Sequence, residues 1–256
     1  LGITPSDPSS DSKYMRRVYL DIAGRLPSTQ EVREFLSSTE ENKRARLVDH
    51  LLELPEFGDH WANKWADLLR PNPYRVGIKA VLNYDAWIRA SFRQNKPYDQ
   101  FVRDLITARG STWRNGAATL FRDRRSPDEL TPLVSQLFLG IRLECAKCHH
   151  HPFEKWGQTD FFSFAAYFAR LGRKGSGLSP PISGGEEVIM TRASGTVSHP
   201  LTGKVLPPRP LYGTAPELRE GEDPRVALAR WITSKDNAYF SQVAVNRVWA
   251  DLMGRG

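Results

Sequence analysis

ELTPLVSQLFLGIRL, residues 129–143, is an apolar run whose large side chains recur at helical spacing. These side chains are Leu130, Leu133, Val134, Leu137, Phe138 and Ile141. Apolar residues three and four positions apart share one face of a helix, so the run predicts a buried helix. It leads directly into Cys145-Ala146-Lys147-Cys148-His149, which contains both of the chain's 2 cysteines. We therefore expect a core helix that delivers the chain to the cysteine motif.

The spacing of the two cysteines and the histidine is typical of covalent haem attachment. C-x-x-C-H is the attachment pattern of c-type haem. Two thiols about one helical turn apart can each form a thioether to one haem vinyl group, and the adjacent histidine can reach the iron. Cys145 and Cys148 are therefore candidate cofactor-binding residues, and His149 is the candidate proximal ligand.

Helical patterns dominate the rest of the chain. Polar N-cap residues, apolar stripes and closing glycines or prolines indicate about nine or ten helices. Ser28 and Glu31, for example, have the spacing of a capping box. Residues 187–190 and 195–199 instead have the pattern of two short strands of a hairpin or small sheet. We predict a mainly α, multi-helix protein with a small β-hairpin or sheet insertion around residues 187–206.

Composition and charge argue against several classes of protein. The 256 residues carry a net charge of +7, with 40% hydrophobic and 25% charged residues, as in soluble globular proteins. No apolar run approaches the roughly 20 residues that cross a bilayer, so no membrane span is expected. The arginines alternate with acidic residues and no nucleic-acid-binding motif accompanies them, so nucleic acid is not an expected partner. Residues 1–6 have no signal-peptide pattern and suggest a start inside a longer chain.

Several motifs, taken in order, resemble those of a known family. They are YLDIAGRLP (19–27), NKPYDQFV (95–102), QLFLG (136–140), CAKCHHHPF (145–153) and HPLTGK (199–204). The chain resembles the cytochrome-like domain of large planctomycete proteins, the family DUF1549 or planctomycete cytochrome type 2. Residues 237–250 resemble the opening of its companion domain, DUF1553.

The resemblance implies a division of the chain into three parts. Residues 1–171 would form a helical cytochrome-like domain that carries the C-x-x-C-H motif. Residues 172–223 would form a linker rich in Gly and Pro with the small β element. Residues 224–256 would be the start of a second helical domain, truncated here.

The resemblance also implies where and how the protein works. Family members resemble exported proteins, which predicts a periplasmic or cell-surface location. The expected function is that of an exported c-type haem-binding domain for electron transfer, serving an oxidoreductase partner. The C-terminal DUF1553-like domain and a separate redox partner protein are the expected partners. No nucleophile–base pair, phosphate loop or carboxylate dyad stands out, so the sequence leaves open whether the chain is an enzyme.

A haem iron held by His149 would have a sixth position for another ligand. His199 is the first candidate, because the HPLTGK motif has no other explanation. A histidine that caps the turn before Pro200 explains the same residue equally well. Met190 is the second candidate. His151 is a third, although its place in the local turn also suits it to hold a carbonyl, a carboxylate or a haem propionate.

Two other interpretations use the same residues without haem. Two thiolates with His149 or His151, and His199 or Glu154, could supply four tetrahedral zinc ligands. Alternatively, a C-x-x-C disulfide could stabilise an exported scaffold or interaction domain that binds no cofactor. Haem c, zinc and no cofactor are therefore all open at the level of the sequence.

Overall fold

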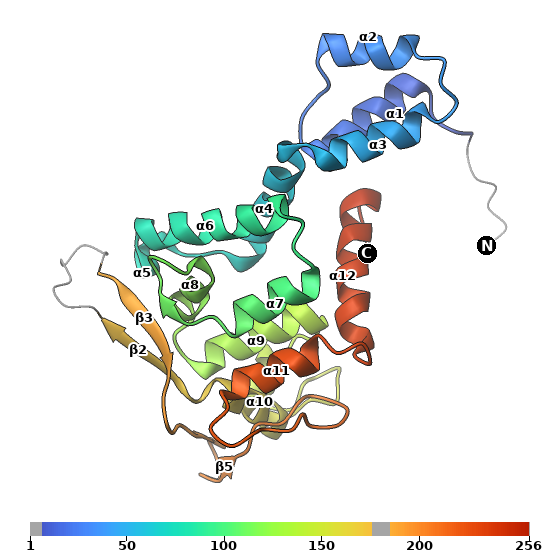
Figure 1. Cartoon of the computed structure of the whole chain (residues 1–256). Coiled ribbons are helices and arrows are strands. Elements are labelled where there is room, and N and C mark those ends of the chain that lie inside the picture. Colours follow the sequence, from blue (N-terminus) through green and yellow to red (C-terminus); the bar gives the residue numbers. More distant parts are fainter. Residues whose placement is uncertain (1–6, 176–184, 256) are drawn as a thin grey trace. The chain divides into compact units, whose positions relative to one another are not determined.

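Helices form most of the chain, as predicted (Figure 1). The structure is a computed structural model that describes residues 7–175 and 185–255. The predicted start at residues 1–6 and residues 176–184 of the predicted linker lie outside the described residues. The long and medium helices of the described part are α1 (Asp11–Val18), α2 (Thr29–Ser37), α3 (Lys43–Glu53), α4 (Pro55–Leu69), α6 (Ile78–Arg93), α7 (Tyr98–Ile106), α9 (Pro127–Leu139), α10 (Gln158–Ala165), α11 (Pro224–Ile232) and α12 (Ala238–Met253). Two short helices, α5 (Pro73–Val76) and α8 (Thr119–Asp123), bring the described number above the nine or ten that periodicity indicated.

The chain divides into two compact units. The first unit comprises Leu1–Asp67 with Arg89–Asn95, and the second comprises Leu68–Ile88 with Lys96–Gly256. No helix in the described part is both long and apolar enough to cross a membrane.

In the first unit, α1 continues into a π-helical turn, Tyr19–Ala23, which ends at Gly24 with a φ of 69°. The core of this unit gathers around Met15, Tyr19, Phe35, Leu47 and Leu51. The predicted capping box is confirmed: Ser28 accepts a hydrogen bond from the Glu31 amide, and Glu31 accepts one from the Ser28 amide.

The second unit is built around α9, which contacts α10 and α12. The helix begins at a second capping box, Ser126 with Glu129, and Pro127 occupies its first turn. It ends at Gly140, whose φ of 70° is the left-handed conformation that favours glycine. The predicted apolar helix is thus confirmed, with its end slightly earlier than the run of apolar residues. Because the helix ends at Gly140, the chain can change direction before it reaches Cys145.

The strand predicted at residues 187–190 is present, but its predicted pairing with residues 195–199 is wrong. It is β3 (Glu187–Thr191), which pairs antiparallel with β2 (Leu171–Gly175) and β1 (Gly110–Ser111). Residues 197–198 instead form β4, which pairs with β5 (Val205–Leu206) in a separate hairpin. One partner of β3 is the strand before it rather than the strand after it. The other, β1, is distant in sequence and only two residues long, so it gives no periodic signal.

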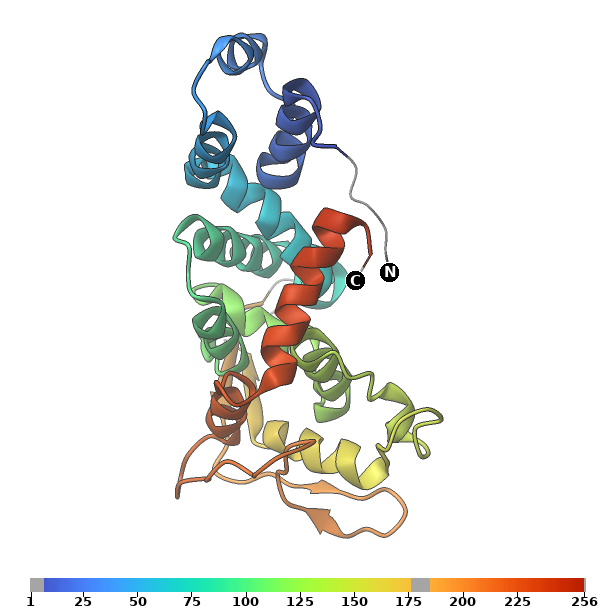
Figure 2. The ribbon, with the colours of Figure 1, turned by 90° about the vertical axis from the view of Figure 1, so that its right-hand side faces the viewer.

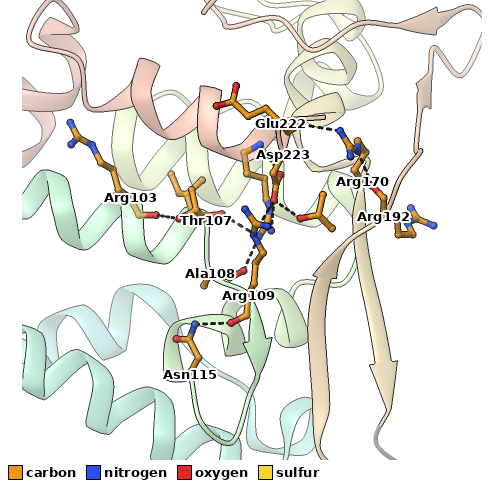
Figure 3. A network of polar contacts seen from close by, with 12 residues as sticks. Arg103, Thr107, Ala108, Arg109, Asn115, Arg170, Arg192, Glu222 and Asp223 are labelled. Atoms are coloured by element: carbon orange, nitrogen blue, oxygen red, sulfur yellow. Dashed lines mark hydrogen bonds and ion pairs between the residues drawn. The ribbon is translucent and has the colours of Figure 1, made fainter. Parts of the chain in front are cut away.

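A buried ion pair holds the start of α11. Arg225 donates from Nη2 to Asp223 at 2.7 Å and from Nη1 to the carbonyl of Ala108 at 3.0 Å. Asp223 also accepts from Thr191 of β3 at 2.6 Å. Figure 3 shows this network between the end of α7, the sheet and α11. It connects residues 224–256 to the helices and sheet of the second unit.

Candidate functional site

The cysteine motif forms a tight turn at the surface of the second unit. Residues Glu144–Lys147 are a 3-10 helix, η3, and the Cys148 amide donates to the Cys145 carbonyl at 3.2 Å. Cys145 lies in η3 and Cys148 is its C-cap residue, so the two thiols are one 3-10 turn apart. Both are exposed and free. Ala146, between them, is fully buried and fixes the turn to the protein.

The His149 ring is oriented by the chain that follows it. Its Nδ1 lies 2.5 Å from the carbonyl oxygen of His150. A carbonyl only accepts hydrogen bonds, so this nitrogen must carry the proton. The Nε2 lone pair of the neutral ring is then available to a metal. Iron- and zinc-bound histidines are commonly held in this way, with the second ring nitrogen donating to a backbone carbonyl.

In the His151 ring, Nδ1 is a hydrogen-bond acceptor rather than a donor. Its Nδ1 accepts hydrogen bonds from the amides of Phe153 and Glu154, at 3.3 and 3.0 Å. The neutral ring therefore carries its proton on Nε2, which makes that nitrogen a donor rather than a metal ligand. The His151 amide also donates to the Trp156 carbonyl at 2.8 Å, which closes the loop. His151 thus holds the local turn, and its predicted role as an iron ligand stays untested.

A glutamine that the sequence did not single out attaches the motif to α10. The Gln158 side-chain amide donates to the carbonyls of Lys147 and Cys148, at 3.0 and 3.1 Å. Lys147 is also paired with Asp128 in the first turn of α9, at 3.1 Å. The motif is therefore tied to both helices that flank it. No sequence pattern identifies such a residue, because its partners are backbone carbonyls.

The predicted residue His199 lies on the hairpin of β4 and β5, which packs against α10. The His199 and Phe162 rings have centroids 6.3 Å apart. The His199 Nδ1 accepts a hydrogen bond from the Leu201 amide at 3.3 Å, so the ring also caps its own turn. Figure 2 shows the hairpin, in orange, along one side of α10, in yellow, with the chain of residues 144–157 at one end of that helix.

Met190, the second candidate for the sixth iron position, lies within the three-stranded sheet. It pairs with Gly172 of β2, where a Cβ would come within 3.0 Å of the Met190 Cγ. Its side chain packs across the sheet at that glycine. The structure brings Cys145, Cys148, His149 and His151 together on one loop, and it places His199 against the same helix.

The turn supplies the groups that covalent haem attachment requires, two thiols and a histidine. The thiols are unbonded and exposed, and the Nδ1 contact of His149 leaves its Nε2 available. Within residues 7–175 and 185–255, no three His, Cys, Asp or Glu side chains converge as metal ligands. The predicted zinc alternative stays untested.

Comparison with known proteins identifies the family. The family model PSCyt2, described as a protein of unknown function (DUF1549), matches residues 1–173. The chain belongs to the PSCyt2 family. A second family model, PSD1, also described as a protein of unknown function (DUF1553), matches residues 224–256. Both resemblances inferred from the motifs are thus confirmed.

The match to PSCyt2 ends at the sheet, and the match to PSD1 begins at the first residue of α11. The cysteine motif therefore lies in the PSCyt2 part, whereas His199 lies in the stretch between the two matches. No curated protein and no solved structure gives a significant match to the chain. The family descriptions assign no activity, so a function must be argued from the site itself.

Proposed function

We propose that this PSCyt2 chain binds haem c covalently at the turn of residues 145–149 and carries electrons. The proposal is supported by one observation: two free, exposed thiols lie one 3-10 turn apart, next to a histidine whose Nδ1 contact with the His150 carbonyl leaves Nε2 available. The bound haem iron would supply one-electron redox chemistry.

Each residue of the turn has a separate role in this proposal. The Cys145 and Cys148 thiols would hold the haem by adding across its two vinyl groups, sulfur to one carbon and hydrogen to the other, which is redox-neutral and needs no oxidant. His149 would hold the iron through Nε2, while its Nδ1–H donates to the His150 carbonyl and keeps the ring in place. Gln158 holds the turn in shape by binding the carbonyls of Lys147 and Cys148.

The cellular setting follows from the same chemistry. Bacteria attach haem c outside the cytoplasm, so the proposal includes export to the periplasm or cell surface. The electron partner would be another protein or a domain joined to this one, and residues 224–256 are the start of a PSD1 domain. An oxidoreductase that acts on an extracellular substrate would suit this arrangement.

The test is to produce the chain in an export host that has the haem c attachment machinery. The purified protein should show a pyridine haemochrome band and a mass increase of one haem that survives acid-acetone extraction. The variant with Cys145→Ala and Cys148→Ala should lose both signals. His150→Ala removes an exposed side chain but keeps the backbone carbonyl that binds the His149 ring, so it should keep both signals.

Three results would contradict the proposal. The first is colourless protein with two titratable thiols, from a host that matures a control cytochrome in parallel. The second is a Cys145–Cys148 disulfide in that same protein, which would favour a scaffold without a cofactor. The third is one zinc per chain by elemental analysis, which would favour the metal alternative.

A further inference from the structure

Two segments distant in sequence lie against the same face of α10. Gln158 bonds to the motif turn through the carbonyls of Lys147 and Cys148, and Phe162 contacts the His199 ring. Positions 158 and 162 are four residues apart, so they share one face of the helix about 6 Å apart along its axis. The C-x-x-C-H turn and His199 therefore both contact this face of α10.

The backbone fixes His199 in this position. Its amide donates to the Lys204 carbonyl at 2.9 Å, and its own carbonyl accepts from the Gly203 amide at 2.9 Å. Gly203 has a φ of 68°, which a tight turn requires and which favours glycine. The histidine is thus held at the end of a closed hairpin.

The Nδ1 atom of His199 accepts fewer and longer hydrogen bonds than the Nδ1 atom of His151. One backbone amide binds the His199 Nδ1 at 3.3 Å, beyond the usual length of such a bond. Two amides bind the His151 Nδ1, the closer at 3.0 Å. Moving the proton to Nδ1, which frees Nε2 for a metal, therefore disrupts one weak contact in His199 and two contacts in His151.

Large apolar side chains are exposed beside both segments. Phe153, in the loop after the motif, is 92% exposed, and Leu201, in the turn after His199, is 81% exposed. An apolar side chain is therefore exposed next to each of the two segments. A flat, largely apolar macrocycle attached at Cys145 and Cys148 would cover them.

We propose that His199 is the second axial ligand of the iron, so that the site has two histidines and no open position. The inference rests on the haem attachment proposed above. A filled position suits electron transfer, because no small molecule can then reach the iron without displacing a protein ligand. His199 would bring to the site a residue from outside the stretch that matches PSCyt2.

The test compares His199→Ala with His151→Ala, both in haem-loaded full chain from the same host. The wild-type ferric protein should give a six-coordinate, low-spin electron paramagnetic resonance spectrum, and its ferrous form should not bind carbon monoxide readily. His199→Ala should keep its covalent haem, become high-spin, bind carbon monoxide and recover the low-spin signal when imidazole is added. His151→Ala should keep the wild-type spectrum.

The outcomes separate the two proposals. Covalent haem with an unchanged low-spin spectrum in His199→Ala would overturn the role of His199 and leave haem attachment intact. A high-spin wild-type spectrum would do the same. A wild-type chain that acquires no haem would overturn the attachment itself and, with it, this inference. The far-ultraviolet circular dichroism of each variant shows whether it has folded.

Discussion

Asp223 and Arg225 form an ion pair that is almost completely buried, with 3% and 1% of their side chains exposed. Burial alone would raise the pKa of Asp223, but the hydrogen bonds and charge of Arg225 outweigh it and hold that pKa below its ordinary value. The carboxylate also caps α11 and binds Thr191 of β3. The pair therefore fixes the first helix of the PSD1 match to the sheet and to the end of α7 (Figure 3).

Replacing Asp223 with asparagine should destabilise the second unit by about 3 kcal/mol. The side chain keeps its shape, but Arg225 loses its counter-charge, and an uncompensated buried charge is costly. Urea denaturation measures the change in the free energy of unfolding. Asp99→Asn is the matched control, because Asp99 pairs with Arg103 at an exposed site on α7. That change should cost less than about 1 kcal/mol. Equal effects of the two variants would show that the buried pair has no special role.

The first unit should lose stability in acid because of Glu31. Arg25 binds this carboxylate with two hydrogen bonds, at 3.0 and 2.9 Å, and holds its pKa well below the ordinary value of 4.5. A carboxylate with a lowered pKa stabilises the fold above its unfolded pKa and loses that contribution as the pH falls. Protection of the α1 and α3 amides from hydrogen exchange should therefore decrease below about pH 4.5.

Glu31→Gln should remove most of this pH dependence and cost about 1 kcal/mol at neutral pH, since the pair is partly exposed. Glu40→Gln, which removes a more exposed pair with Arg46, is the control and should keep the wild-type profile. Retention of the full acid sensitivity in Glu31→Gln would exclude the Arg25–Glu31 pair as its cause.

The features that the sequence predicted correctly depend on neighbouring residues. The capping box of Ser28 and Glu31 acts across three positions, and the helix before the motif is encoded in its own apolar spacing. The close placement of Cys145, Cys148 and His149 also follows from their adjacency. Such features need no knowledge of the rest of the fold.

The features that the sequence could not supply depend on contacts that carry no spacing signal. The partners of β3 come from residues 110–111 and from the strand before it, 171–175, whereas the local pattern favoured pairing with the strand after it. The contact of Gln158 with the motif has no spacing signal either, since a glutamine amide can bind any carbonyl within reach. The different tautomers of His149 and His151 depend on which backbone groups of their own loop face each ring.

Gly140 should tolerate alanine less well than Gly203, although both have a φ near 70°. A Cβ on either residue introduces similar strain in the left-handed conformation, about 1 kcal/mol. At Gly140, that Cβ would also lie 2.8 Å from the Cγ2 of Val243 in α12, whereas at Gly203 no described residue lies within 4 Å. Gly140→Ala should therefore cost about 2–3 kcal/mol in the free energy of unfolding, by the added cost of overpacking. Adding Val243→Ala should recover part of this loss, and a purely additive double variant would argue against the clash.

A fully buried tyrosine and a half-buried one should respond in opposite directions to the loss of their hydroxyl groups. The Tyr84 hydroxyl is fully buried in α6 and has no hydrogen-bond partner within the described residues, and burial raises its pKa well above the ordinary value. The Tyr212 hydroxyl lies 2.6 Å from the side-chain oxygen of Asn237 and donates to it. A buried hydroxyl without a partner costs free energy, whereas one with a partner contributes it. Tyr84→Phe should thus raise the free energy of unfolding by about 1 kcal/mol, and Tyr212→Phe should lower it by about 1 kcal/mol. Urea denaturation of the two variants measures both signs in the same unit. A loss of stability in Tyr84→Phe would mean that its hydroxyl is hydrogen-bonded in solution.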